Sequence, residues 1–150
     1  MLKEGDRFQH ASNLNQDWPS GRGVFHNDAK SLLVWVNGED QLQIISMQNG
    51  SGVVEMFDRM VRALDNIEAT CQYLRDDHLG FVTTCPSNLG TALDVSVHIK
   101  LKKFAARKNH FMAIANKYQV RVKPVKTGVF SICNAKKLGS TENMILYGML

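Results

Sequence analysis

The stretch Cys85-Pro-Ser-Asn-Leu-Gly-Thr91 limits what this chain can fold into more than any other feature. The apolar run Gly80–Thr84 leads into it, and the alternating run Asp94–Lys100 leads out of it. Pro86 removes a ladder donor and favours an extended Cys85, whereas the residues that follow favour a turn. The pattern predicts a loop between two strands that presents a thiol, a hydroxyl and an amide side by side.

The run after this loop alternates with the two-residue period of a strand. Its apolar face holds Val95, Val97 and Ile99, and its polar face holds Asp94, Ser96 and His98. These residues alone are equally compatible with an ordinary half-buried strand whose polar face lies in water.

Hydrophobic periodicity predicts the remaining elements. Two strands joined by a hairpin turn are expected at Leu32–Val36 and Gln41–Met47, and two later strands at Gln119–Lys123 and Val129–Cys133, with a turn at Pro124–Gly128. Helices are expected at Gly52–Glu68, at Phe104–Tyr118 and from about Thr141. This order predicts an α+β fold, an antiparallel sheet flanked by helices.

Composition narrows the class of protein. A chain of 150 residues with 44% hydrophobic content is expected to form a single domain. No apolar run approaches the roughly 20 residues of a membrane span, and the N-terminus has no signal-peptide pattern. The three cysteines are odd in number and widely spaced, which favours reduced thiols in a cytoplasmic protein over disulfides or a zinc site.

Positive charge gathers in the C-terminal part of the chain. Between Val95 and Thr141 there are eleven lysines and arginines but no Asp or Glu. Such a concentration of positive charge favours an anionic partner, which can be nucleotide phosphates, a nucleic acid or an acidic membrane surface. A basic face that serves only solubility remains an alternative, and no P-loop pattern occurs in the chain.

Several motifs, in order, resemble the phosphagen (ATP:guanidino) kinases, and arginine kinases more than creatine kinases. They are the loop from Cys85 to Thr91, Trp18 to Asn27, Leu33 to Asn37, Glu39-Asp40, Ile44 to Gln48, Ser96 to Leu101 and Lys137 to Glu142. The resemblance covers the C-terminal catalytic domain of that family. It implies that residues 1–150 are a catalytic domain without the helical N-terminal domain of full-length members.

The resemblance implies roles for individual residues. Glu39 and Cys85 match the catalytic residues that hold the substrate guanidinium, and Glu39 also matches the group that accepts its proton. His26 and His98 match residues at the adenine, and Ser96 belongs to the segment beside the phosphates. The implied ligands are a guanidino compound such as arginine and ATP or ADP, with Mg²⁺ held by the nucleotide and not by protein side chains.

The chain departs from the family pattern where the nucleotide phosphates bind. Gln43, Asp94 and Lys123 stand at positions of phosphate-binding arginines, and Ser131 replaces an aspartate of the last strand. The loop after Lys123 is short and lacks a second substrate glutamate. Because one transition-state arginine is worth about 10³–10⁵ in rate, these changes predict weak nucleotide binding and impaired phosphoryl transfer.

Three hypotheses about function follow. The first is an ATP:guanidino phosphotransferase catalytic domain with impaired activity, and the second is an inactive relative that binds a nucleotide or a partner. The third is a nucleic-acid-binding module, which the lack of interleaved aromatic residues in the basic stretch disfavours. The absence of a covering N-terminal domain also predicts an exposed apolar surface suited to self-association or to an N-terminal-domain partner.

Overall fold

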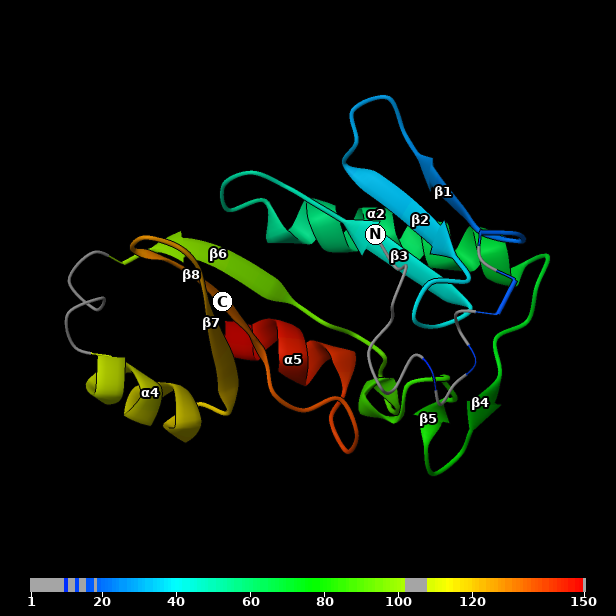
Figure 1. The fold of residues 1–150 in the computed structure, drawn as a ribbon. Helices are drawn as coiled ribbons and strands as arrows, with labels where there is room; N and C mark the ends of the chain where they lie inside the picture. The colour runs from blue at the N-terminus through cyan, green and yellow to red at the C-terminus, as the bar shows by residue number, and fades with distance from the viewer. Residues whose placement is uncertain (1–9, 11–12, 14–15, 18, 102–107, 150) are drawn as a thin grey trace. The chain divides into compact units, whose positions relative to one another are not determined.

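The computed structural model describes residues 10, 13, 16–17, 19–101 and 108–149. The chain divides into two compact units, the first formed by Met1–Leu74 with Thr83–Pro86 and the second by Arg75–Val82 with Ser87–Leu150 (Figure 1). The boundary therefore runs through the loop that contains Cys85, whose last residues belong to the second unit.

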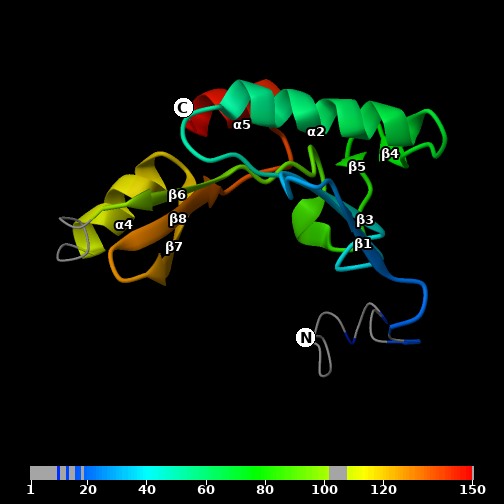
Figure 2. The ribbon, with the colours of Figure 1, turned by 90° about the horizontal axis from the view of Figure 1, so that it is seen from above.

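An antiparallel sheet and one long helix form the first unit. The strands β1 (Gly23–His26), β2 (Leu32–Val36) and β3 (Leu42–Ser46) pair in that order, and α2 (Val53–Glu68) packs against β3 (Figure 2). The predicted bounds of β2 are confirmed, and those of β3 and α2 are confirmed to within one residue. The match follows from their clear patterns, since β2 is a continuous apolar run and α2 carries an apolar stripe at helical spacing.

Arg59 ties α2 to the sheet through hydrogen bonds as well as apolar contact. Its guanidinium donates to the carbonyl oxygens of Ser31 and Met47, at 3.2 and 3.0 Å, and to Gln48 Oε1 at 2.9 Å. Ser46 Oγ donates to the carbonyl oxygen of Met56 at 2.7 Å. A side chain inside the predicted helix thus satisfies carbonyl groups at the end of β3 and in the β1–β2 connection.

The second unit contains two further sheets. The short strands β4 (Arg75–Asp76) and β5 (Gly80–Phe81) form a hairpin, and β6 (Ser96–Lys100), β8 (Val129–Asn134) and β7 (Val120–Lys126) form an antiparallel sheet in the order β6–β8–β7. The helix α4 (Lys108–Lys117) packs against β7 and α5 (Glu142–Met149) against β8 (Figure 1). Of the helix predicted at Phe104–Tyr118, residues 104–107 lie outside the described part of the chain.

The core of the second unit is small and lies between its sheet and helices. Its buried apolar side chains are Leu93, Val95, Phe111, Ala115, Cys133 and Ile145. The rings of Phe111 and Phe130 meet edge to face with centroids 5.2 Å apart, which fixes α4 on the sheet. Val97 and Ile99, predicted on the apolar face of β6, stay 37% and 40% exposed.

Three local predictions need correction. The strand expected at Gly80–Thr84 is only the two-residue β5, which pairs with β4. The strand expected at Asp94–Lys100 begins only at Ser96, and the loop before it contains a 3₁₀ turn, η1 (Pro86–Asn88). The turn expected at Pro124–Gly128 is shorter, because β7 continues past Pro124 to Lys126 with a register shift between them. Pro124 is tolerated there since β7 is an edge strand.

The α+β class is confirmed, with antiparallel sheets and helices against them. Among the described residues, no helix combines the length and the apolar character that crossing a bilayer requires.

Candidate active site

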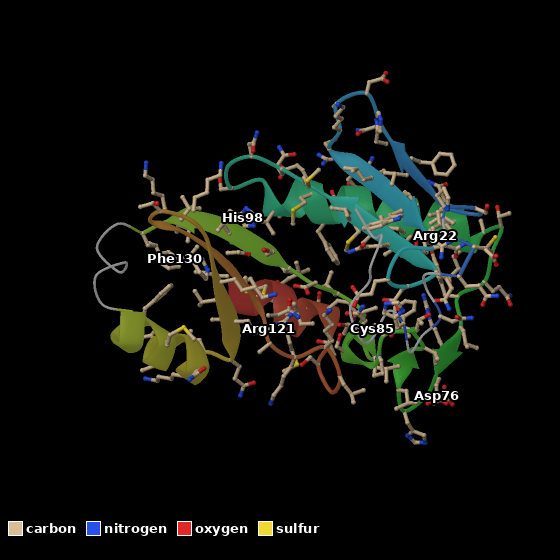
Figure 3. The ribbon with its side chains drawn as sticks, viewed as in Figure 1. Arg22, Asp76, Cys85, His98, Arg121 and Phe130 are labelled. Atoms are coloured by element: carbon tan, nitrogen blue, oxygen red, sulfur yellow. The ribbon has the colours of Figure 1, made fainter. Side chains whose placement is uncertain are left out.

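Cys85 is held against the turn between β2 and β3. Its backbone N–H donates to Asp40 Oδ1 at 2.8 Å, and its carbonyl oxygen accepts from Thr83 Oγ1 at 2.8 Å (Figure 3). All three residues belong to the first unit. Because Asp40 directly follows Glu39, this hydrogen bond joins the two segments that carry the predicted guanidinium-binding residues.

Glu39 is exposed in a tight turn whose conformation is well determined by its neighbours. Asn37 has a positive φ of 52°, and its N–H donates to the carbonyl oxygen of Gln41 at 2.8 Å. Its side-chain amide donates to the carbonyl oxygen of Gly21 at 2.7 Å. Gly38 is buried against Trp35, where an added Cβ would lie 2.8 Å from an indole carbon. The predicted hairpin turn is confirmed.

A polar cleft of about 400 Å³ opens beside this turn, within the first unit. Arg22, Asn37, Asp40 and Thr84 line it together with residues from the preceding segment. The Arg22 guanidinium donates to the carbonyl oxygens of Ser20 and Gln16, at 3.0 and 3.2 Å. The cleft thus combines a carboxylate, an amide and a guanidinium next to the Cys85 segment.

His26 and Gln43 lie on one face of the β1–β2–β3 sheet. His26 pairs with Leu33, and Leu33 pairs with Ile45, two residues from Gln43 on β3. Because directly paired residues point to the same side, both are on the face opposite to Ser46. Both side chains are exposed, and His26 Nδ1 lies 3.0 Å from the Asn27 carbonyl oxygen.

The second half of the motif packs backbone against backbone. Gly90 has a φ of +104°, and a Cβ there would lie 2.5 Å from the carbonyl oxygen of Lys137. A Cβ on Gly80 would overlap the carbonyl group of Gly90, whose oxygen accepts a hydrogen bond from Phe81 N at 2.8 Å. Glycine is required at both positions by conformation and by space.

Asp94 carries its negative charge between two cations. Its Oδ2 lies 3.3 Å from Arg121 Nη2 and 3.3 Å from Lys137 Nζ (Figure 3 labels Arg121). Lys137 Nζ also donates to Asn88 Oδ1 at 2.6 Å, so the same lysine holds the 3₁₀ turn. The carboxylate predicted to repel a phosphate group is therefore neutralised inside the second unit.

The polar face of the β6–β8–β7 sheet aligns three predicted positions. His98 pairs with Ser131, and Ser131 pairs with Lys123, so the three side chains form a row on one face. Ser96 Oγ and Ser131 Oγ are 2.8 Å apart. His98 and Lys123 are exposed. The face presents an imidazole, a hydroxyl pair and an ammonium group to solvent.

Four residues of this arrangement received no role from the sequence, although each belongs to a quoted motif or to the basic stretch. Asp40, Asn88, Arg121 and Lys137 position the motif or neutralise Asp94. Asp40 adjoins Glu39 in one of the quoted motifs, which was the available signal. Among the described side chains, no three His, Cys, Asp or Glu residues are grouped as metal ligands.

Comparison with known proteins identifies the class. The model of the ATP:guanido phosphotransferase C-terminal catalytic domain matches residues 4–150. The chain therefore belongs to that family, and the resemblance seen in the motifs is confirmed. It is 48% identical to the arginine kinase of Polybetes pythagoricus and 46% identical to that of Limulus polyphemus. In both cases the match covers 95% of this chain and 42% of the relative.

Solved structures support the same assignment. The duplicated taurocyamine kinase from Schistosoma mansoni with bound transition state analog components is similar with a TM-score of 0.90 and 36% identity. That match covers 99% of this chain and 21% of the other. Lombricine kinase is similar with a TM-score of 0.83 and 33% identity, over 89% of this chain and 40% of the other. The fold is that of a guanidino kinase catalytic domain.

Proposed function

We propose that this chain is an arginine-kinase-like catalytic domain that binds a guanidino substrate and a nucleotide but transfers the phosphoryl group poorly. The observation that carries the proposal is the hydrogen bond from Cys85 N to Asp40 within a chain that belongs to the family. It ties the Cys85 loop to the turn that bears Glu39.

A guanidino compound such as arginine fits the chemistry of the first unit. A guanidinium is planar and cationic, so a carboxylate such as Glu39 is its complementary partner. In this proposal Glu39 holds the guanidinium and accepts its proton, while Cys85 contacts the same group from the neighbouring segment. The adjacent cleft offers Asp40 and Asn37 as further polar groups.

Each unit, taken by itself, carries exposed side chains suited to a nucleotide. In the first unit His26 is an exposed aromatic ring suited to an adenine. In the second unit His98 is another, and Lys123 supplies a positive charge in the same row as His98. In this proposal the nucleotide, not protein side chains, would hold Mg²⁺, which would supply neutralisation of phosphate charge. The protein residues bind and orient the nucleotide.

The proposed impairment rests on the phosphate positions. Gln43 is neutral, and the carboxylate of Asp94 is committed to Arg121 and Lys137. Lys123 keeps a positive charge but lacks the planar fork that grips two phosphate oxygens. Phosphoryl transfer depends on positioning and charge neutralisation, so a weakened clamp lowers the rate more than it lowers binding.

A phosphorus NMR assay with arginine and Mg-ATP tests this function. We expect no phosphoarginine above a protein-free control, together with weak binding of ADP by calorimetry. Rapid phosphoarginine formation would contradict the impairment. No ADP binding at millimolar concentration, and no arginine binding, would contradict the function as a whole.

We further propose a cytoplasmic protein that associates with a second copy or with an N-terminal domain. The three cysteines carry thiols, as a reducing compartment would maintain. Large apolar side chains are exposed in each unit, including Phe25 and Val54 in the first and Tyr147 in the second. Sedimentation velocity over a concentration series tests self-association, and a monomer at every concentration would contradict it.

A further inference from the structure

The ion cluster around Asp94 has cations that are fixed independently of the carboxylate. Arg121 Nε donates to the carbonyl oxygen of Asn134 at 3.2 Å, and Lys137 Nζ donates to Asn88 Oδ1 at 2.6 Å. Asn134 is itself buried, and its side chain bonds Val95 N and Leu93 O at 2.9 and 3.1 Å. Both cations therefore keep an anchor when Asp94 is removed.

Exposure separates the members of the cluster. The Lys137 side chain is only 10% exposed, whereas those of Asp94 and Arg121 are 45% and 46% exposed. A lysine that is so largely removed from water requires a nearby anion, because the neutral Asn88 oxygen offsets only part of the desolvation. Asp94 supplies that anion from a half-exposed position, from which its carboxylate can turn into solvent.

We propose that Arg121 and Lys137 form an anion site that Asp94 occupies as an internal anion, and that a phosphate or pyrophosphate group is its alternative occupant. The anion site is inferred from the cluster alone. That its phosphate belongs to a nucleotide rests on the proposed function. An ammonium group and a guanidinium 3.3 Å from one carboxylate oxygen are the donors that bind phosphate oxygens in proteins.

Calorimetry with inorganic pyrophosphate tests the site in the full chain. We expect Asp94→Asn to bind pyrophosphate at least about ten-fold more tightly than the unmodified chain, because the competing charge is gone. Asp77→Asn is the matched control. It removes one exposed carboxylate from the same unit, and it changes the net charge of the chain by the same amount as Asp94→Asn. The control is expected to change the affinity less than about two-fold, as a long-range effect of net charge would.

Arg121→Gln makes the test specific. Combined with Asp94→Asn it should abolish the gain, and alone it should weaken pyrophosphate binding, because Arg121 is one of the two cations of the proposed site. Equal affinities in Asp94→Asn and the unmodified chain, or a gain that survives in the double variant, would overturn the proposal. If Asp94→Asn does not fold, an unchanged pyrophosphate affinity in Arg121→Gln alone overturns the proposal.

Titration with ADP identifies the source of the phosphate. A matching gain for ADP in Asp94→Asn supports nucleotide phosphates as the occupant. A gain for pyrophosphate without one for ADP supports the anion site and assigns it to an inorganic phosphate. If ADP binds the unmodified chain and Asp94→Asn adds nothing for either ligand, the proposed nucleotide function stands and the anion site is refuted.

Discussion

The segments around Cys85 and around Asp94 are only nine residues apart in the sequence but are held by different kinds of contact. Around Cys85, the backbone N–H donates to the Asp40 side chain and the backbone carbonyl accepts from the Thr83 hydroxyl. Around Asp94, a carboxylate stands where the family resemblance implies an arginine, and Arg121 and Lys137 each lie 3.3 Å from its Oδ2. The Cys85 segment is therefore held by its backbone groups, whereas the Asp94 segment is held by ion pairs.

The largest expected effect on stability comes from substituting Gly90 in the Cys85–Thr91 loop. Gly90→Ala should destabilise the second unit by about 3 kcal/mol or more, since φ is +104° and the Cβ would lie 2.5 Å from Lys137 O. Gly139→Ala is the control, because its φ is +72° and nothing lies within 4 Å, so it should cost only about 1 kcal/mol. Equal losses in chemical denaturation would show that backbone packing at Gly90 is unimportant.

The buried amide next to the Asp94 cluster should have the next largest effect. Asn134→Ala leaves Val95 N and the carbonyl oxygens of Leu93 and Lys136 without this partner, and should lower the free energy of unfolding by about 2–3 kcal/mol. Asn143→Ala, at an exposed position of α5, should stay within about 0.5 kcal/mol. A loss below about 1 kcal/mol at Asn134 would contradict its structural role.

A smaller and local effect is expected at Asp40. Asp40→Ala removes the acceptor for Cys85 N and should lower stability by about 1 kcal/mol while making Cys85 react faster with iodoacetamide. Asp40→Asn retains an oxygen at the same place and should leave the alkylation rate close to that of the original chain. Peptide mass mapping resolves Cys85 from Cys71, and identical Cys85 rates in all three proteins would refute the contact.

These expectations also show what the sequence could and could not predict. The strands β2 and β3 and the helix α2 were predictable because β2 is a continuous apolar run, β3 begins with apolar and polar residues in alternation, and α2 carries an apolar stripe at helical spacing. The turn predicted at Pro124–Gly128 was too long, because a proline is expected to end a central strand. Only the sheet order shows that β7 is an edge strand, where proline is tolerated. The neutralisation of Asp94 could not be predicted, since Arg121 lies 27 residues further along the chain and is brought close by the pairing of both β6 and β7 with β8.

The smallest expected effect concerns Asp76, at the turn between β4 and β5. Asp76 accepts hydrogen bonds from Leu79 N and His78 N at 2.9 and 2.8 Å, and these hold the pKa of its carboxyl below the usual 3.8 (Figure 3). A lowered pKa in the folded state means that this contribution is present above about pH 4 and is lost as the pH falls through the folded value. Asp76→Asn should therefore flatten the acid limb of a stability profile, and an unchanged limb would contradict the assignment.

The central claim is that the substrate-side segments are retained while the phosphate clamp is weakened by charge. Calorimetric titration with ADP tests it most directly, comparing the unmodified chain with Gln43→Arg/Lys123→Arg, which restores two arginines and leaves the Asp94 cluster intact. Gln72→Arg/Lys136→Arg makes the same change in charge at two exposed positions elsewhere. We expect the first variant to bind ADP about ten-fold more tightly and the second to match the unmodified chain. Equal affinities in all three proteins would contradict the claim.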